Sequence, residues 1–464
     1  MAQTPQDDAL HEECAVFGVS LARHEEAAGV AYAGLLSLQH RGQEGAGIAV
    51  VSENNIICRK GEGLASELFP DGVLAGLPKG RTAVGHTLYS KAGGSEKKTA
   101  GPFVQEYLTG RIVAALSGSI TNADEIRREL TDCGLQFDTS SDGEVVTSLI
   151  AYHISQERDL LSGAAKAAGM LEGAFSIVIA SGSDKVAAVR DPNGFRPLCL
   201  GRSEAGAAVA SESCALDSCG FEFVRDVRPG EVVIIENGKI TEQGVKLEKR
   251  MEAGHGLCIF EFVYFARADS IIDGLSVYNA RQRMGRVLAE EYPADADVVC
   301  GAPDTGLDAA NGYSAESGIP LVSGFVRNQY IGRSFIYPTQ IQRESAVRLK
   351  LNPLSASIGG KRVVFVDDSI VRGTTTETTV KSLKAAGAKE VHVRISSPPV
   401  RYTCYYGTNI DREENLIANK TGLDGIRRKI GADSLGFISI AGLKRACGEC
   451  RLNFCTACYI KEHR

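Results

Sequence analysis

Residues 363–376 read Val-Val-Phe-Val-Asp-Asp-Ser-Ile-Val-Arg-Gly-Thr-Thr-Thr. The apolar run predicts a buried strand, and Asp367 and Asp368 come where that strand ends. In a parallel α/β sheet, ligands bind at the carboxyl ends of the strands. A helix expected from about Glu377 to Ala386 adds its positive end to the backbone N–H groups of Arg372–Thr376, and this junction favours a phosphate. Paired carboxylates beside such a loop suit sugar hydroxyls and Mg²⁺.

An ordinary strand end that caps a helix would explain Asp-Asp-Ser alone. The coincidence of strand, acid pair, basic residue and hydroxyl-rich loop favours a binding site. The segment resembles the phosphoribosylpyrophosphate-binding signature of type I phosphoribosyltransferases. That resemblance implies that the loop holds the 5-phosphate and that the acid pair holds the ribose hydroxyls and Mg²⁺. The substrate-binding residues expected here are Asp367, Asp368, Ser369, Arg372, Gly373, Thr374 and Thr375.

The bulk properties exclude several classes of protein. A length of 464 residues predicts two or three domains, and 44% hydrophobic residues suffice for full cores. The net charge of −6 gives no reason to expect a nucleic-acid partner. No apolar run reaches 18 residues, so we expect no membrane span. The acidic start, Met1–Glu13, is unlike a secretory signal, and a cytoplasmic location is expected.

Two kinds of pattern divide the chain. Up to about residue 245, strand patterns such as Ile112–Leu116 are grouped apart from helical patterns such as Glu25–Gln39, which indicates an α+β sandwich. The second half alternates strand and helix, which indicates a parallel α/β domain. The boundary is expected in the polar stretch Lys246–Gly256. The resulting expectation is a propeptide over 1–13, a first domain over 14–250 and a second over 251–464.

Cys14 alone reads as a core cysteine at the start of a strand. The rest of the half changes that interpretation, because several motifs follow in the order and spacing of the class II glutamine amidotransferase domain. They are Leu38 to Glu44, Gly85-His86, Tyr89-Ser90, Ser141-Asp142 and Arg190 to Gly194. The resemblance implies a four-layered αββα sandwich of the N-terminal-nucleophile hydrolase type. It also implies a glutamine-binding set of Gly85, His86, Tyr89, Ser117, Gly118 and Asp142 around Cys14, with Asp142 on the α-ammonium group.

The chemistry explains where the cysteine stands. Amide hydrolysis needs a nucleophile and a base. Once Met1–Glu13 is removed, the free α-amino group of Cys14 can serve its own thiol as that base, since an α-amino pKa of about 7.7 suits proton transfer at neutral pH.

From Cys14 to Cys458, the two halves together resemble the amidophosphoribosyltransferase family. The resemblance implies that glutamine is hydrolysed at Cys14 and that ammonia displaces pyrophosphate from phosphoribosylpyrophosphate, in the first step of purine synthesis. It further implies feedback inhibition by purine nucleotides and a homotetramer. Two readings stay open beside it: an ammonia-dependent transferase with an impaired glutaminase half, and a non-catalytic regulator that binds phosphoribosylpyrophosphate or nucleotides.

Two positions depart from the family pattern. Residues 85–91 are Gly-His-Thr-Leu-Tyr-Ser-Lys, so Leu88 stands where the family has an arginine that clasps the glutamine carboxylate. Leucine cannot make that bidentate bond, and Lys91 would replace it only as a point charge. Ser117-Gly118 occupies the place of the family's Asn-Gly pair, which stabilises the oxyanion. A lost oxyanion donor costs about 10²–10³ in rate in other enzymes. We therefore expect an impaired glutaminase.

The transferase half keeps its pattern. Asp304 and Thr305 follow an expected strand and would approach the pyrophosphate, with Thr305 near Mg²⁺. The polar segment Gly324–Leu354, which includes Arg333 and Lys350, reads either as a solvated loop or as a loop that closes over the substrate and excludes water.

Thirteen cysteines in a chain expected in a reducing compartment indicate metal rather than disulfides. By resemblance to the iron–sulfur members of the family, one [4Fe–4S] cluster is bound by Cys258, Cys404, Cys455 and Cys458. A four-cysteine zinc site is the rival. Cys447 and Cys450 form a second C-x-x-C that could replace Cys455 and Cys458.

Overall fold

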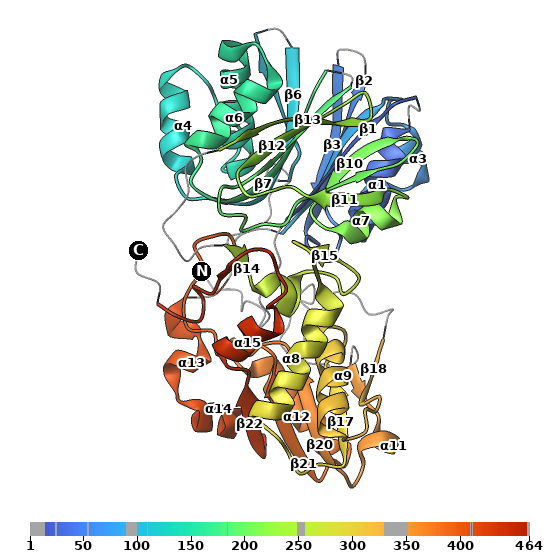
Figure 1. Ribbon diagram of the computed structural model, residues 1–464, viewed down its shortest axis with the longest axis vertical. Coiled ribbons are helices and arrows are strands. Elements are labelled where there is room, and N and C mark those ends of the chain that lie inside the picture. The colour runs from blue at the N-terminus through green and yellow to red at the C-terminus, as the bar shows by residue number, and fades with distance from the viewer. Residues whose placement is uncertain are drawn as a thin grey trace.

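The computed structural model describes residues 14–23, 26–52, 55–89, 100–108, 110–182, 184–247, 256–328, 351–408, 410 and 412–461. These residues form two parts stacked along the long axis of the molecule, with the N-terminal half of the chain in one and the C-terminal half in the other (Figure 1). The first ends with a strand at Lys246 and the second begins with a strand at Leu257. The expected boundary at 250/251 falls between them, outside the described residues.

The first part contains a seven-stranded antiparallel sheet in the order β11-β9-β10-β1-β4-β2-β3. Its strands are β1 (Ala15–Leu21), β2 (Gly45–Ser52), β3 (Asn55–Glu62), β4 (Thr82–Leu88), β9 (Cys199–Arg202), β10 (Gly206–Ala210) and β11 (Glu222–Asp226). Helices on this side of the sandwich are α1 (Ala27–Ser37), α2 (Ala65–Leu68), α3 (Asp71–Ala75) and α7 (Ser213–Ser218).

A six-stranded antiparallel sheet, in the order β13-β12-β8-β7-β6-β5, packs against the first. Its strands are β5 (Phe103–Tyr107), β6 (Gly110–Ile120), β7 (Gly173–Ser181), β8 (Lys185–Arg190), β12 (Glu231–Glu236) and β13 (Lys239–Lys246). The helices beside it are α4 (Ala123–Asp132), α5 (Asp142–Glu157) and α6 (Leu160–Met170).

A continuous apolar core fills the space between the two sheets. Val16 and Val84 of one sheet pack with Val113 and Val178 of the other. The sheets approach so closely that a Cβ on Gly18 would lie 2.5 Å from Val178 Cγ1, so only glycine fits there without a shift. With helices outside both sheets, the expected αββα sandwich is confirmed (Figure 1).

The second part is built on a parallel sheet in the order β17-β20-β21-β22. The strands are β17 (Val298–Gly301), β20 (Arg362–Asp367), β21 (Glu390–Ile395) and β22 (Ser434–Phe437). Its longer helices are α8 (Val277–Glu291), α9 (Thr305–Ser317), α12 (Thr374–Ala385), α14 (Leu423–Ile430) and α15 (Ile440–Ala446). The shorter elements are β14 (Leu257–Cys258), the π-helix η2 (Glu261–Phe265), β15 (Ile271–Ile272), β16 (Leu275–Ser276), β18 (Phe325–Arg327), β19 (Leu351–Pro353), α11 (Ser355–Ile358), the 3₁₀ helix η4 (Glu413–Asn415), α13 (Ile417–Lys420) and β23 (Phe454–Cys455).

Strand β20 shows why its sequence is uniformly apolar. Val364 and Val366 pack into the core under α8 and α9, whereas Val363 and Phe365 pack into the core under α12 and α14. A strand covered on both faces needs apolar residues at every position, because successive side chains point to opposite faces. The expected parallel α/β domain is thus confirmed.

Two local predictions differ from the structure. The helix after the acid pair begins at Thr374 rather than near Glu377, so Thr374 and Thr375 belong to its first turn. Asn122 precedes α4 but makes no side-chain cap bond. Its amide instead donates to Met170 O and accepts from Glu172 N, which ties the start of α4 to the end of α6.

Buried ion pairs join the two parts. Arg41 donates to both carboxylate oxygens of Glu261 in the π-helix and also to Glu212, at 2.8 Å each, and all three side chains are fully buried. A second pair joins Arg190 to Asp273 at 2.7 Å. A buried charge is tolerated when it is paired and hydrogen-bonded, and removing one partner is costly. These contacts hold the end of the sandwich against the parallel-sheet part.

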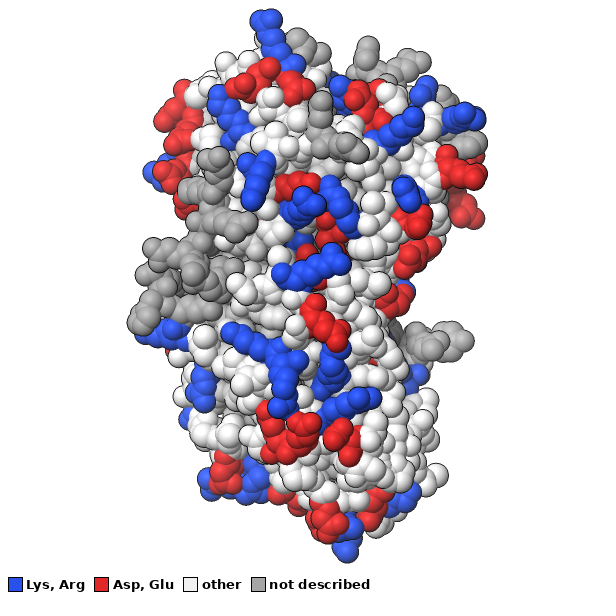
Figure 2. Space-filling view, viewed as in Figure 1, with Lys and Arg blue, Asp and Glu red and all other residues white. Residues whose placement is uncertain are grey.

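The surface carries mixed charge. Figure 2 shows Lys and Arg side chains interspersed with Asp and Glu over the face in view. None of the helices in the described segments combines the length and hydropathy needed to cross a bilayer.

Candidate active sites

The first candidate site lies where β1, β4 and β6 converge. Cys14 directly precedes β1, and its thiol lies 3.7 Å from Tyr89 O at the end of β4. Its backbone carbonyl accepts a hydrogen bond of 2.5 Å from the Ser117 hydroxyl of β6. The structure therefore brings together Cys14, Tyr89 and Ser117, as the sequence predicts.

The backbone at Gly118 explains why a glycine stands in this segment. Its φ is +126°, and a Cβ would lie 2.0 Å from Ala174 O of the neighbouring strand. Only glycine is compatible with both conditions. Because the Ser117 hydroxyl is donated to the Cys14 carbonyl, it is not directed at an incoming substrate in this state.

Asp142 opens helix α5, after the N-cap Ser141. Its carboxylate accepts from Ile120 N at 3.1 Å and from the Ser119 hydroxyl at 3.5 Å. These bonds place the carboxylate beside the end of β6, two residues beyond Gly118. A role in holding the α-ammonium group stays a prediction that this position suits.

The other members of the predicted glutamine-binding set are interior residues. Gly85 lies inside β4 against Leu35 of α1, where a Cβ would come within 2.9 Å of that side chain. His86 is buried and its Nε2 donates to Leu116 O at 3.0 Å. Leu88 is also buried, at the end of β4. Lys91, the cation considered as a replacement for the missing arginine, lies outside the described residues.

The second candidate site lies at the carboxyl end of β20. Thr305, the first residue of α9, contacts Asp368 with Oγ1 and Oδ2 2.5 Å apart, and Ser369 donates to the other oxygen of Asp368 at 2.6 Å. Asp367 accepts from the Asp368 backbone N–H at 3.0 Å. Burial raises the pKa of Asp367 well above its usual range, and the neighbouring Asp368 raises it further. Two adjacent carboxylates, one buried and one half-buried, are electrostatically suited to a cation.

The loop after the acid pair has the expected phosphate-binding form. Gly373 has φ +86° and is the N-cap of α12, so the chain turns sharply into the helix and directs the first N–H groups outward. Lys429 of α14 donates to Arg372 O at 2.9 Å, which brings a further cation to the loop. Lys429 was not predicted, because it is 57 residues away in the sequence.

The expected pyrophosphate side is only partly described. Asp304 forms an ion pair with Arg327 at the surface, between the start of α9 and β18. Arg333 and Lys350, predicted to close over the substrate, lie outside the described residues, and their role stays a prediction.

The predicted cluster ligands lie together. Cys258 and Cys455 are direct partners in the short parallel pair β14–β23. Burial raises the pKa of the Cys458 thiol well above its usual range, and the neighbouring thiols of Cys258, Cys404 and Cys455 raise it further. The backbone N–H of Tyr406 donates to Cys404 Sγ at 3.3 Å. Three distant segments thus bring the four cysteines near one another.

The second C-x-x-C has partners of its own. Cys447 ends α15, and its thiol interacts with Cys450 and Arg283. Cys450 interacts with Asp273 and Arg190 of the ion pair between the two parts. No three His, Cys, Asp or Glu side chains of the described residues converge as ligands of a single metal ion.

Sequence patterns did not indicate two residues that connect the sites to their surroundings. Arg281 of α8 donates to the carbonyls of Phe262 and Ala266 in the π-helix region, and it interacts electrostatically with Asp368. Glu261 receives Arg41 from 220 residues away. Only tertiary contacts show the partners of these two residues.

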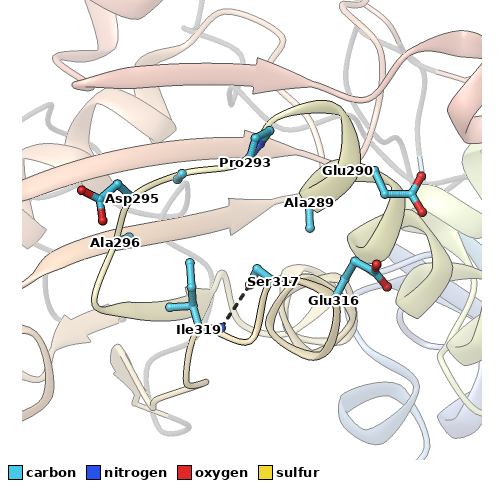
Figure 3. A pocket seen from close by; sticks show the side chains of 9 residues that line it. Ala289, Glu290, Pro293, Asp295, Ala296, Glu316, Ser317 and Ile319 are labelled. Carbon is cyan, nitrogen blue, oxygen red and sulfur yellow. Dashed lines mark hydrogen bonds between the residues drawn. The ribbon is translucent and has the colours of Figure 1, made fainter.

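A shallow pocket of about 360 Å³ lies at the opposite end of α8 and α9 from these sites. Figure 3 shows small apolar side chains along it and the carboxylates of Glu290, Asp295 and Glu316 around it. Glu290 pairs with Arg445 and Asp295 with Arg362, which accounts for two of those charges.

A cysteine at the head of an N-terminal-nucleophile sandwich and an acid pair above a phosphate loop define a glutamine amidotransferase joined to a phosphoribosyltransferase. A family model described as a glutamine amidotransferase domain matches residues 94–218. The chain is 44% identical over 454 residues to an amidophosphoribosyltransferase of Archaeoglobus fulgidus, covering 97% of each chain. It is 42% identical over 460 residues to that of Bacillus subtilis, covering 98% of this chain and 94% of the relative.

The solved structures agree. The glutamine phosphoribosylpyrophosphate amidotransferase of Bacillus subtilis, complexed with ADP and GMP, superposes with a TM-score of 0.87 at 39% identity and 97% coverage of both chains. The chain belongs to the amidophosphoribosyltransferase family, glutamine-dependent glycosyltransferases that catalyse the first step of purine synthesis.

Proposed function

We propose that the two candidate sites divide the reaction. Cys14, freed at its amino group by removal of residues 1–13, attacks the amide of glutamine and releases ammonia. Ammonia then reaches the transferase site, where it displaces pyrophosphate from phosphoribosylpyrophosphate and gives 5-phosphoribosylamine. The observation that carries this division is the convergence of Thr305 and Ser369 on Asp368, beside Asp367 and above the loop at Gly373.

The acid pair fits Mg²⁺. Asp367 and Asp368 supply adjacent carboxylate oxygens, Thr305 supplies a hydroxyl, and such oxygen donors suit this ion. When bound, Mg²⁺ would help to neutralise the charge that develops on the departing pyrophosphate. The first turn of α12 would hold the 5-phosphate, with the hydroxyls of Thr374 and Thr375 and the cation of Lys429 beside it.

The four clustered cysteines fit a [4Fe–4S] group. Four thiols in a largely buried site, with a backbone N–H directed at one sulfur, match how such clusters are held. Each cysteine of a cluster binds a different iron, so the four sulfurs need not meet at one ion. By tying β14, the Cys404 loop and β23 together, the group would fix the C-terminal segment against the domain boundary.

Regulation and assembly are proposed by likeness. The Bacillus subtilis structure is complexed with ADP and GMP, so purine nucleotides are the proposed inhibitors of this chain. A homotetramer and a cytoplasmic location remain predictions, and elution volume on a calibrated column tests the first.

The most informative experiment compares nitrogen donors. Pyrophosphate release from phosphoribosylpyrophosphate is measured with glutamine and with ammonium in purified protein. Release with both supports the two-site enzyme, and release with ammonium alone supports a transferase whose glutaminase half is inactive. If neither donor gives pyrophosphate release, the interpretation that remains is a non-catalytic regulator.

We expect the glutamine-dependent rate to be low relative to the ammonium-dependent rate. Leu88 is buried at the end of β4 and offers no carboxylate clamp, and the Ser117 hydroxyl is engaged with the Cys14 carbonyl. A lost charged partner costs about 2–5 kcal/mol in binding, which predicts a raised KM for glutamine. The double variant Leu88→Arg, Ser117→Asn should lower that KM and raise kcat, while ammonium-dependent turnover stays unchanged.

The matched control is Leu36→Arg on α1 for the added charge, together with Ser66→Asn on α2 for the added amide, since both side chains are exposed. Efficient use of glutamine at sub-millimolar concentration by the unmodified protein would contradict the expected impairment. Intact-mass analysis of the purified protein should show a chain that begins at Cys14.

A further inference from the structure

His86 joins the two sheets of the sandwich directly behind the Ser117–Gly118 segment. The residue lies on β4 of the seven-stranded sheet, and its Nε2 is 3.0 Å from the carbonyl oxygen of Leu116 on β6 of the six-stranded sheet. Leu116 immediately precedes Ser117, whose hydroxyl binds the Cys14 carbonyl. A single side chain therefore spans the sandwich at the residue that leads into the catalytic corner.

The ring is held in one state. A carbonyl can only accept, so Nε2 carries the proton and donates it, whereas the buried Nδ1 has no hydrogen-bond partner among the described residues. Burial lowers the pKa of His86 to about 4, and the ring is thus neutral at neutral pH. Gly101 packs against the ring, where a Cβ would come within 2.9 Å of Nδ1. The close glycine and the single bond leave the imidazole no alternative orientation.

The ring of His86 is only 4% exposed and its one donor is occupied, which disfavours a direct contact with glutamine. We propose instead that His86 is a positioning residue: through the Leu116 carbonyl it fixes the Ser117–Gly118 backbone at the place where the amide oxygen of glutamine is stabilised. The inference rests on the proposed glutaminase role of Cys14. Gly118 adds to it, because a Cβ there would lie 2.0 Å from Ala174 O, so this segment is held closely against the neighbouring strand.

The test compares His86→Gln with His86→Met. The glutamine side chain places an N–H donor at a reach similar to that of Nε2, whereas methionine fills comparable volume without a donor. For His86→Met we expect kcat for glutamine hydrolysis to fall by roughly tenfold to 10²-fold, less than the loss of a direct oxyanion donor, with little change in KM. His86→Gln should recover most of kcat, and both variants should keep the ammonium-dependent rate.

The pH profile separates this role from acid–base catalysis. Since a neutral amide replaces a neutral ring, wild type and His86→Gln should share one profile of kcat between pH 6 and 8. Loss of the acidic limb in His86→Gln would overturn the proposal, as would an unchanged kcat in His86→Met or a change confined to KM. If His86→Met does not fold, His86→Asn replaces it in the test, because the shorter asparagine amide does not reach Leu116 O. Full glutaminase activity of His86→Asn would contradict the proposal. Glutamine hydrolysis that survives Cys14→Ala would instead refute the proposed function itself.

Discussion

Replacing either member of the acid pair, in Asp367→Asn or Asp368→Asn, should reduce pyrophosphate release on the order of 10²-fold with glutamine and with ammonium alike. Asp368 is buried and Asp367 half-buried at the end of β20, and Thr305 and Ser369 converge on Asp368. An amide keeps the shape of the side chain but removes the charge that suits a divalent cation and the ribose hydroxyls. The loss should therefore not depend on the nitrogen donor.

The matched control is Asp424→Asn on the exposed face of α14, which removes a carboxylate from the same domain and leaves the site intact. Rates within twofold of wild type are expected for the control. Glutamine hydrolysis, measured as glutamate formed, tests whether the Asp367 and Asp368 variants remain folded. Near-normal turnover with ammonium in both would remove the acid pair from the active site.

The second large effect concerns the clustered cysteines. Purified without oxygen, the protein should be brown and contain iron and acid-labile sulfide in a ratio near one. Replacement of one ligand by serine should abolish the cluster and reduce soluble yield, because the group joins β14, the Cys404 loop and β23. The variants to be compared are Cys258→Ser, Cys404→Ser, Cys455→Ser and Cys458→Ser.

Cys447→Ser and Cys450→Ser are the controls, since their thiols face Arg283 and the Arg190–Asp273 pair. We expect both variants to stay brown. A colourless wild-type protein with one zinc per chain would contradict the proposed iron–sulfur cluster. If Cys447→Ser loses the colour and Cys455→Ser keeps it, the cluster is bound by Cys447 and Cys450 in place of Cys455 and Cys458.

Local patterns predicted much of the fold. The uniformly apolar run at Val363–Val366 indicated a strand covered on both faces, and its alternate residues do enter two separate cores. The start of α12 was misplaced by three residues, because threonines read as loop although a helix N-terminus accepts them. The full order of strands within the two stacked sheets could not be predicted, since pairings such as β1–β10 and β1–β4 join residues remote in sequence.

For the candidate sites, too, local motifs were predicted from the sequence, whereas contacts between distant segments were not. Motif resemblance located Cys14, Ser117, Asp367 and Asp368, and the structure places Cys14 directly before β1, Ser117 within β6 and the acid pair at the end of β20. Resemblance gave no reason to expect the Arg41–Glu261 pair, whose members are 220 residues apart and fully buried. It also placed His86 in the glutamine-binding set, whereas the role proposed for the ring acts through the Leu116 carbonyl, one step behind the substrate.

The two-site account is tested most directly by Cys14→Ala assayed with both nitrogen donors. The thiol lies in the sandwich, whereas the acid pair lies in the parallel-sheet domain. We predict that Cys14→Ala loses glutamine-dependent pyrophosphate release to background and keeps the ammonium-dependent rate of wild type. Retention of glutamine-dependent release, or loss of release with both donors in a folded variant, would contradict the account.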